Sequence, residues 1–530
     1  MSAIAAWPAM AADDVPPMEA ADAGQDASFD VVEYRVEGNS VLPRIKVEEA
    51  LYRHLGKNKQ IADVEQARVE LERAYRDAGY PTVLVDIPEQ EVASGVVRLR
   101  VTEGRIDKVR VTGARYFSQG KLLERFPTLR SGSVLYLPDM QKGLGEANRA
   151  ADRKVTPILK PGATPGTVGV EFKVEDRLPL HGSFELNDRY SANTSRLRLS
   201  GMLRYDNLWQ REHSLSVQYL TSPERTSEVS VWSASYLMPV AADSDRLLSF
   251  YAVRSRSDVA AVGDVKVLGQ GDIYGVRAIL PLPPRQDYFH SLVLGVDYKD
   301  MKENVVLVGA DSIRTPISYA PFSVQYNAIM PGRKGTTQAN IGAIFSLRGL
   351  VDETIDCFDQ QVSEFECKRF GARANFFYVR AGVQRTHKLP GNLSLIGKID
   401  GQLTDQPLIS NEQFGGGGLD SVRGYTEFER LGDKALRGSL ELRSPPLAKR
   451  VSGRLDELYL LGFVDGAKLS LVQPLAGQTS RFDLSSGGAG LVLRGWGGVR
   501  ASLLAAVPFE NGAFTRAGDV RAHFQLAYDF

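Results

Sequence analysis

The sequence contains no run of about 18 uncharged apolar residues, so no segment of it can cross a bilayer as an α-helix. Charge is balanced, with 64 Lys and Arg against 64 Asp and Glu, which gives no signature of nucleic-acid binding or of adsorption on anionic lipid. Catalytic motifs are also missing, because the six histidines are scattered and neither His-Glu-x-x-His nor Gly-x-Ser-x-Gly occurs. We therefore expect no enzyme, no catalytic residue, no cofactor, no metal and no nucleic-acid partner. Any membrane span must consist of strands.

Cysteine is nearly absent. Cys357 and Cys367 are the only two, and they lie ten positions apart in a polar, acidic stretch that is typical of an exposed loop. A disulfide closing so short a loop is worth roughly 3 kcal/mol and needs an oxidising compartment such as the periplasm or the cell surface. A pair of free thiols is the alternative. Zinc binding is disfavoured, because no histidine is near and the spacing matches no common zinc site.

The N-terminus gives a second indication of the compartment. Residues 3–7 are apolar, and Ala9-Met10-Ala11 has the small-x-small form of a signal-peptidase site, although no basic segment precedes it. We read residues 1–11 as the remnant of an export signal, with an ordinary disordered N-terminus as the alternative. Residues 12–28, rich in Ala, Asp and Pro, are expected to be a linker that buries no core.

Residues 29–104 are predicted to form a small α+β domain with the order strand, helix, helix, strand, strand. The second helix is the strongest element, since its apolar residues recur at helical spacing. We expect it to begin with Asp63 as N-cap and Gln66 at the third helical position. Two strands should follow, at residues 82–87 and 96–101, the second with strict alternation of apolar and basic residues.

The same plan repeats in residues 105–177, which predicts a second domain produced by internal duplication. Its long helix is expected to carry an apolar stripe that runs to Ala151. The Pro-Gly pairs of residues 161–166 should make tight turns between that helix and the last two strands. Both predicted sheets end in strands that could accept another strand at their edge.

From residue 178 to residue 530, short alternating segments separated by Gly, Asn, Asp and Pro turns replace the helical pattern. The 353 residues allow roughly 16 strands with lipid on one face and a polar lumen on the other. A soluble β-sandwich is the alternative. The last twelve residues alternate best, which places His523 on the lumen side and predicts that Tyr528 and Phe530 belong to a C-terminal insertion signal read by the barrel assembly machinery.

Three motifs carry a resemblance to a known family. The first combines Asn148, Arg153 and Val155 with the run Leu159 to Thr167; the second is Val422-Arg423-Gly424-Tyr425; the third is Phe463-Val464-Asp465. On these residues the chain, from about Phe29 onward, resembles the transporter component of two-partner secretion systems, within the hemolysin-activation type of the POTRA-plus-barrel superfamily.

The resemblance implies that residues 29–104 and 105–177 are periplasmic POTRA domains and that residues 178–530 are an outer-membrane barrel. It also implies that Arg423 stands at the tip of a long extracellular loop, folded back into the lumen, and faces Asp465. A buried charge of this kind needs an opposite charge beside it.

Two departures from the family pattern stand out. The glycine expected two residues after Asp465 is replaced by Ala467, which puts the local strand geometry in doubt. The helix that plugs the lumen in relatives has no counterpart, because residues 12–28 are too short and too rich in proline, so gating is expected to depend more heavily on the loop that bears Arg423.

The implied function is the passage of an unfolded exoprotein, docked through its N-terminal secretion domain on the POTRA pair, through a barrel held in outer-membrane lipid. Exposed strand edges suit this docking, because backbone hydrogen bonds are tolerant of sequence. The sequence does not identify this exoprotein, and a neighbouring reading frame with a long β-helical repeat would settle most of the question. An outer-membrane assembly factor of the same superfamily is the main alternative, and a diffusion porin is a weaker one.

Overall fold

The computed structural model places two compact units along the chain, Met1–Arg177 and Leu178–Phe530. Each is described by itself. The described residues are 28–530 except for positions 93, 193, 242, 243, 258, 263, 264, 307–311, 348–353, 358 and 359. The predicted export segment and all of the predicted linker except residue 28 therefore lie outside them. No helix among the described residues is long and apolar enough to cross a bilayer.

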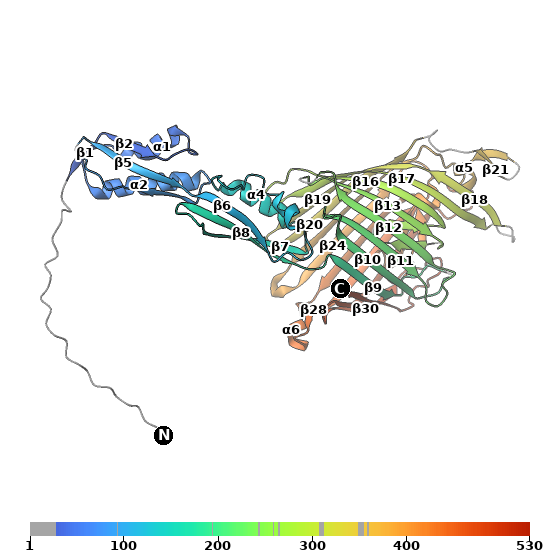
Figure 1. Cartoon of the computed structure of the whole chain (residues 1–530). Helices are drawn as coiled ribbons and strands as arrows, with labels where there is room; N and C mark the ends of the chain where they lie inside the picture. Colours follow the sequence, from blue (N-terminus) through green and yellow to red (C-terminus); the bar gives the residue numbers. More distant parts are fainter. Residues whose placement is uncertain are drawn as a thin grey trace, which may run out of the picture. The chain divides into compact units, whose positions relative to one another are not determined.

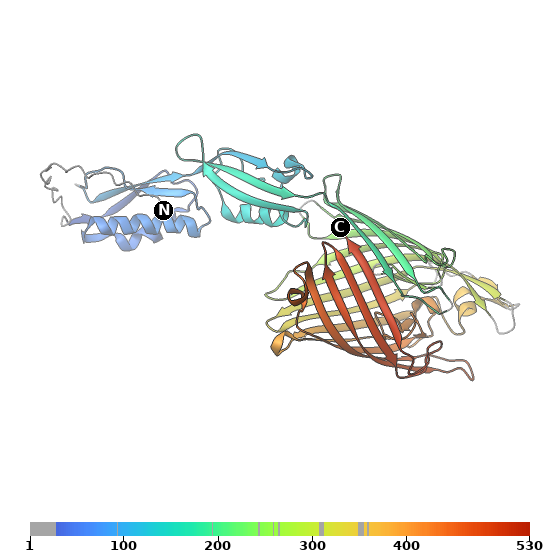
Figure 2. The same cartoon turned by 90° about the horizontal axis from the view of Figure 1, so that it is seen from below.

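The first small domain packs two helices against one face of a three-stranded sheet of order β2-β5-β4, in which β2 is parallel to β5 (Figure 1). The long helix runs alongside this sheet (Figure 2). Leu71, Tyr75 and Leu99 are fully buried at the interface of helix and sheet. Its elements are β1 (Phe29–Val31), β2 (Glu33–Glu37), α1 (Arg44–Leu51), η1 (Tyr52–His54), β3 (Gly56–Lys59), α2 (Ile61–Asp77), β4 (Val83–Asp86) and β5 (Val96–Glu103).

The start of α2 was predicted wrongly. The helix begins at Ile61 with Gln60 as N-cap, and the Asp63 carboxylate accepts a hydrogen bond from the Gln60 backbone N–H at 2.8 Å. Asp63 therefore stands at the third helical position, where an acidic side chain satisfies the free amide of the cap. The predicted pair, Asp63 and Gln66, and the observed pair, Gln60 and Asp63, have the same spacing, but the observed pair lies three residues earlier. The helix is therefore almost one turn longer at its N-terminus than predicted.

The second small domain repeats the plan with a sheet of order β6-β8-β7. Helix α4 ends at Ala147, so the prediction that Ala151 belongs to it was wrong. The helix stops there because the Asn148 side chain bonds both backbone groups of Val155, at 2.6 and 3.1 Å, and turns the chain into β7. Residues 162–166 form the hairpin turn between β7 and β8 rather than a link from the helix. The elements are β6 (Arg105–Thr112), α3 (Gln119–Leu123), α4 (Leu137–Ala147), β7 (Arg153–Pro161) and β8 (Thr167–Asp176).

One glycine in each domain stands in the same environment. Gly38 has φ +87° and Gly113 has φ +85°, and a Cβ on either would lie 2.3 Å from a carbonyl oxygen, that of Val101 or of Val174. Only glycine tolerates both that torsion and that approach. The same backbone requirement at the same turn of both domains agrees with an internal duplication.

The second unit is a closed antiparallel barrel, in which β31 pairs with β9 (Figure 1). Strands β18 and β19 both pair with β17 in one continuous register, with only Ala320 between them, so they are two halves of one strand and the barrel has the predicted 16. The red C-terminal strands lie side by side in the wall (Figure 2).

The barrel strands are β9 (Leu180–Asn187), β10 (Arg198–Leu208), β11 (His213–Thr221), β12 (Ser230–Pro239), β13 (Leu247–Ser255), β16 (Gly271–Pro281), β17 (Phe289–Val306), β18 (Ser312–Tyr319), β19 (Pro321–Gly332), β20 (Gly335–Ser346), β23 (Phe377–Lys388), β24 (Ser394–Leu403), β27 (Lys434–Arg443), β28 (Leu455–Ser470), β29 (Arg481–Gly495), β30 (Val499–Pro508) and β31 (Arg521–Asp529).

Side chains alternate between the two faces of this wall. Leu436, Leu440 and Val464 are more than half exposed on the outside, whereas Arg437 and Asp465 are buried on the inside. An apolar outer face and a polar lumen are the pattern of a transmembrane barrel. We call the end that holds Leu180 and Asp529 the near end, and the opposite end, where most of the long connections lie, the far end.

The connections carry the remaining elements. These are β14 (Val259–Val262), β15 (Val265–Leu268), β21 (Thr354–Cys357), β22 (Gln360–Ser363), α5 (Glu364–Lys368), η3 (Ser410–Glu412), β25 (Phe414–Gly416) and β26 (Arg430–Gly432) at the far end, with η2 (Pro390–Asn392) and α6 (Ala448–Val451) at the near end.

Candidate functional site in the barrel lumen

The connection between β24 and β27, residues 404–433, folds back into the lumen, and we call it the pore loop. Its two arms pair as β25 and β26 and form a narrow neck. Beyond the neck, Gly417 has φ +102°, and a Cβ there would lie 2.5 Å from the Thr426 carbonyl oxygen. Glycine is therefore required where the two arms approach each other.

Arg423 stands at the tip of the pore loop and is held on three sides. Its Nε and Nη2 donate to the two carboxylate oxygens of Asp465 at 2.7 and 2.8 Å, and its Nη1 donates to Glu441 at 2.6 Å. The guanidinium carbon lies 3.5 Å from the centre of the Phe463 ring. A bidentate ion pair with a cation–π contact fixes both the position and the plane of the side chain.

The burial of this cluster decides how strongly it acts. Arg423 is 8% exposed, Asp465 1% and Glu441 9%, so the charges are shielded from bulk water. Removing one partner of such a pair leaves an uncompensated charge, which costs about 3–5 kcal/mol. The sequence points to Arg423 and Asp465, but it gives no role to Glu441, although that residue follows the alternation on the lumen face of β27.

The displaced glycine has no effect on the strand. Ala467 stands where the family has glycine, yet β28 continues in unbroken register with β27 across this position, through Ser439 opposite Asp465 and Arg437 opposite Ala467. The Ala467 methyl group is buried in a small apolar cluster that includes Val422 and Tyr425 of the loop tip. The alanine therefore contributes to the packing of the tip.

The rest of the tip is anchored by its backbone and by one phenol. The Gly424 N–H donates to His523 Nε2 at 3.2 Å, and His523 Nδ1 lies 3.3 Å from the Asp188 carboxylate. The Tyr425 hydroxyl lies 2.7 Å from the Glu510 carbonyl oxygen. His523 was predicted to line the lumen, but its contact with the loop tip could not be read from the sequence.

The base of the pore loop is held by two further buried carboxylates. Glu412 is 2% exposed, and its oxygens accept from Lys299 at 2.5 Å and from the hydroxyls of Tyr319 and Tyr378, each at 2.6 Å. These partners come from β17, β18 and β23. Glu412 therefore ties the base of the loop to the barrel wall at three strands.

Asp433 is fully buried and closes the base at the other arm. It accepts two hydrogen bonds from Arg369, one from the Gln413 side chain at 3.0 Å, and two from backbone amides of Leu408 and Val472 at 3.0 and 2.7 Å. These five hydrogen bonds use the full accepting capacity of the carboxylate, and a carboxylate bonded in this way holds its position firmly.

Arg369 connects this base to the disulfide. Cys357 at the end of β21 and Cys367 in α5 are bonded to each other, and Arg369 follows α5 directly. Phe365, also in α5, is 1% exposed. The cross-linked hairpin is thus part of the structure that holds the pore loop in place.

Tyr528 and Phe530 lie at the seam where the barrel closes. Both side chains are about half exposed on the outer face, and their rings stack with centres 6.2 Å apart. The backbone of Phe530 exchanges two hydrogen bonds with Gly182, at 3.0 and 3.1 Å. The terminal residue therefore bonds the first barrel strand directly.

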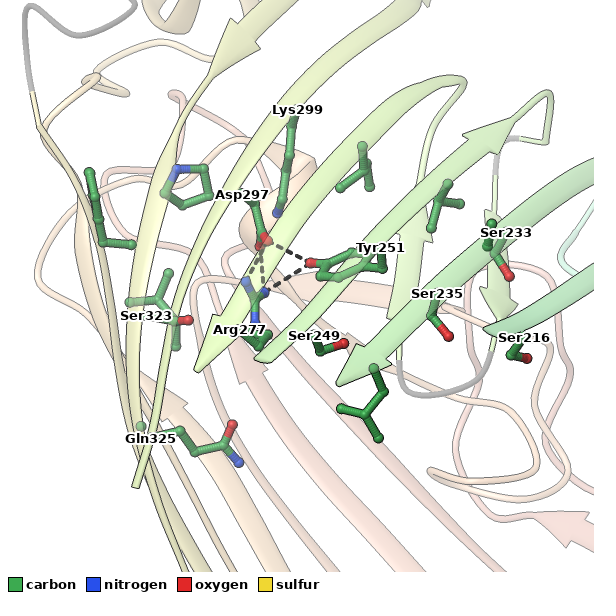
Figure 3. A pocket seen from close by; sticks show the side chains of 18 of the residues that line it. Ser216, Ser233, Ser235, Ser249, Tyr251, Arg277, Asp297, Lys299, Ser323 and Gln325 are labelled. Atoms are coloured by element: carbon green, nitrogen blue, oxygen red, sulfur yellow. Dashed lines mark hydrogen bonds and ion pairs between the residues drawn. The ribbon is translucent and has the colours of Figure 1, made fainter. Parts of the chain in front are cut away.

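The pore loop leaves a cavity of about 1070 Å³ on the opposite side of the lumen. Its wall is shown in Figure 3, where serine side chains of β11, β12 and β13 point into the same space as Tyr251, Arg277 and Asp297. Arg277 donates to both oxygens of Asp297 at 2.6 and 2.8 Å, and the Tyr251 hydroxyl donates to the same carboxylate at 2.6 Å. Arg277 and Asp297 are therefore paired with each other in this wall.

Comparison with family models gives two matches. Residues 29–104 match the POTRA domain, ShlB-type, and residues 166–493 match the model described as haemolysin secretion/activation protein ShlB/FhaC/HecB. The second match covers more than half of the chain.

Individual proteins agree with these models. The chain is 24% identical to the outer membrane transporter CdiB of Dickeya dadantii (strain 3937), over 86% of this chain and 78% of that protein. It is 21% identical to the heme/hemopexin transporter protein HuxB of Haemophilus influenzae, over 71% of this chain and 65% of that protein.

Solved structures show the same fold. CdiB from Escherichia coli superposes with a TM-score of 0.62 at 19% identity, over 97% of this chain and 93% of that chain. BamA from Haemophilus ducreyi lacking POTRA domains 1–3 gives a TM-score of 0.56 at 16% identity, over 95% of this chain and 100% of that chain.

Proposed function

The chain belongs to the haemolysin secretion/activation family ShlB/FhaC/HecB, and we propose on that premise how this outer-membrane transporter carries its exoprotein. The domains of residues 29–177 lie in the periplasm, so the near end of the barrel faces the periplasm and the far end faces the cell exterior. An unfolded exoprotein docks on the periplasmic domains through its N-terminal secretion domain and then crosses the membrane inside the barrel.

Docking by strand addition is supported by the edges of the two small sheets. Among the described residues, β2 and β4 each pair with β5 alone in their sheet. In the second domain, β6 also bonds residues 132–134 at its start, and Val155 of β7 bonds the Asn148 side chain, so these two edges are open only beyond those contacts. An extended segment can therefore add at an edge, where main-chain hydrogen bonds supply affinity without reading sequence. This suits a partner that arrives unfolded.

The observation that carries the proposal is the pore loop with Arg423 paired to Asp465 inside a closed barrel. A diffusion porin needs neither this loop nor periplasmic modules. The assembly-factor alternative shares the fold, but the BamA structure is only 16% identical, which supports the architecture alone. We assign Val422, Arg423, Gly424 and Tyr425 to gating, with Phe463 and Asp465 as the luminal partners.

Deletion of residues 29–177 tests the division of labour. The expected product is a barrel that inserts, conducts ions in planar bilayers and secretes none of the exoprotein encoded by the neighbouring reading frame. Heat-modifiable migration on a gel reports insertion, and exoprotein in the culture medium reports transport. Secretion by the shortened chain would remove the docking step from the proposal.

Insertion itself is assigned to the C-terminal strand, with the barrel assembly machinery and outer-membrane lipid as partners. Tyr528 and Phe530 present aromatic rings at the seam where the barrel closes. Deletion of Phe530 should lower the amount of heat-modifiable barrel in the outer membrane. Unchanged insertion would show that the signal lies elsewhere.

A further inference from the structure

The connection between β27 and β28 carries a surface that the transport of the exoprotein does not use. We propose that α6 and the neighbouring turn between β29 and β30 bind the headgroup of an anionic phospholipid in the periplasmic leaflet of the outer membrane. We call residues 447–454 and 495–498 the headgroup site. The inference goes beyond the proposed function, because it concerns the lipid around the barrel rather than the exoprotein.

Helix α6 lies on the lipid-facing side of the wall, beside the start of β28 (Figure 1). Leu458 and Leu460 both point outward from β28, yet Leu458 is 9% exposed and Leu460 is 53% exposed. Leu458 is covered because it packs in one cluster with Ala448 of α6, against Leu491 and Leu493 on the outer face of β29. The headgroup site is therefore continuous with the apolar band that faces the lipid.

A backbone contact joins the two parts of the headgroup site. The Trp496 N–H donates to the Arg454 carbonyl oxygen at 2.9 Å. A Cβ on Gly495 would lie 2.5 Å from the same oxygen, so this close approach requires glycine at position 495. The connection after β27 and the turn after β29 therefore form one surface at the near end of the barrel.

Three cations of this surface are available to an anion from outside the chain. Lys449 and Arg450 stand in α6, Arg454 follows it, and all three are exposed. Among the residues that the structure describes, no ion pair or hydrogen bond engages their side chains, although Asp456 and Glu457 come next in the sequence. Basic side chains placed in this way beside a membrane attract anionic headgroups.

Two large apolar side chains project from the same surface. Val451 of α6 is 65% exposed and Trp496 is 51% exposed. Tryptophan is enriched where the headgroups of a membrane meet its acyl chains, because the indole has an apolar body and one N–H donor. Contact with lipid removes the apolar surface of both side chains from water, which is favourable.

The combination of charge and apolar surface selects the ligand. The three cations offer a place for a phosphate, and the adjoining outward face of β28 offers apolar contacts to acyl chains. A free phosphate would use the cations alone, and a neutral lipid would use the apolar surface alone. An anionic phospholipid uses both, and the near end of the barrel faces the periplasm, where the headgroups of that leaflet lie.

Lipid selectivity at Trp496 tests the site directly. The other tryptophans, Trp7, Trp209 and Trp232, are replaced by Phe in the full chain, which leaves Trp496 as the fluorophore. The heat-modifiable barrel is placed in phosphatidylcholine vesicles, and quenching by brominated phosphatidylglycerol is compared with quenching by brominated phosphatidylcholine. We expect phosphatidylglycerol to bind beside Trp496 at least about fivefold more tightly, because each nearby cation attracts anionic lipid. Equal quenching by the two lipids would overturn the proposal.

A triple variant asks whether the three cations cause this preference. Lys449→Gln, Arg450→Gln and Arg454→Gln are combined in the chain that keeps Trp496. The substitutions retain side-chain length and polarity but remove the positive charge, so the preference for phosphatidylglycerol should disappear. A preference that persists in the triple variant would show that these cations do not hold the lipid, and the proposal would fail.

A matched control removes the same charges from other turns at the near end. Arg285, Arg333 and Lys334 are exposed in the connections that follow β16 and β19. Their joint replacement by Gln also removes two arginines and one lysine, and it should keep the preference at Trp496. Loss of the preference in this control would assign it to the net charge of the near end and overturn the site.

Inorganic phosphate separates the lipid from the free anion. The quenching is repeated with inorganic phosphate in the buffer, against a reference in which sodium chloride supplies the same ionic strength. The preference for phosphatidylglycerol should be the same in both, because the acyl chains contribute contacts that free phosphate lacks. A preference abolished by phosphate alone would show that the surface binds the free anion, and the assignment to lipid would be wrong.

Discussion

On one side of the lumen, the wall around β27, β28 and β31 holds the pore loop through buried charges, each with several partners. On the other side, β11, β12, β13 and β19 present hydroxyls to an open cavity, and Arg277 of β16 and Asp297 of β17 pair with each other beside them. A buried and fully paired charge has one good position, because every displacement leaves it uncompensated. A hydroxyl accepts many arrangements. One side fixes the tip of the pore loop, and the other lines open space with hydroxyl groups.

The largest effect should come from the loop tip. We expect Arg423→Ala and Asp465→Ala each to cut secretion strongly, because each breaks a buried ion pair, and a buried charge left without its partner costs about 3–5 kcal/mol. Arg423→Ala should be the more severe, since it takes the guanidinium away from Asp465, whereas Asp465→Ala leaves Arg423 paired with Glu441. Exoprotein in the medium and heat-modifiable barrel in the membrane are measured together.

The double variant tests whether the two residues act as one unit. Coupled sites require that Arg423→Ala with Asp465→Ala be hardly worse than the more severe single change. Losses that simply add would mean that the two residues act separately, and normal secretion in either single variant would remove the tip from the mechanism.

The next effect should come from the base. Arg369→Ala takes two of five donors from Asp433, and the three that remain limit the loss to about 2–3 kcal/mol. Secretion and the temperature of barrel unfolding should both fall. Arg373→Ala is the matched control, because Arg373 is exposed in the same connection between α5 and β23. Equal behaviour of the two variants would show that the base does not depend on Arg369.

His523 should give a smaller effect. Replacement by Gln keeps an acceptor within reach of the Gly424 N–H, whereas replacement by Leu leaves this buried amide unbonded at about 1–3 kcal/mol. We expect His523→Leu to lower secretion and His523→Gln to retain most of it. A His523→Leu chain that secretes normally would show that the tip does not need this contact.

The smallest effect concerns a charge at the outer rim. Glu228, in the connection between β11 and β12, accepts from the Ser195 backbone N–H at 2.8 Å and from its hydroxyl at 2.7 Å, and these hydrogen bonds lower the pKa of Glu228 to about 2. A lowered pKa stabilises the fold above the ordinary carboxyl value, and this stabilisation is lost as the pH falls from about 4.5 to about 2.

Limited proteolysis of the surface connections measures this rim contact. Residues 188–197 should stay protected from pH 8 to pH 5 and lose protection at more acidic pH. Glu228→Gln should already be less protected at neutral pH and should change little on acidification. An identical pH profile for the two chains would show that the rim does not use this charge.

Much of the architecture could be predicted from local patterns. Alternation along the strands is a property of neighbouring residues, so it predicts the barrel and its 16 strands without any long-range information. The start of α2 could not be placed, because Gln60 and Asp63 compete as caps with the same spacing to the next acceptor. The end of α4 depended on Asn148, whose bonds to Val155 form only in the folded domain.

The candidate site was predictable only where a motif names both partners. Arg423 and Asp465 were paired in this way. Glu441 and His523 carried a weaker signal, since each is a charged or titratable residue on the lumen face of an alternating strand. Glu412 and Arg369 lie in irregular connections, and their partners are far away in the sequence, so no local pattern could have indicated them.

The bond between Cys357 and Cys367 also orders events in time. Disulfides form only after a chain has left the reducing cytoplasm, so this one arises in the periplasm, where the barrel is still unassembled. It closes a ring whose ends are ten residues apart in the sequence, and such a ring needs no other part of the fold. The hairpin can therefore close before the strands of the barrel pair with one another, so the ring that supports the pore loop does not have to wait for the rest of the barrel unit.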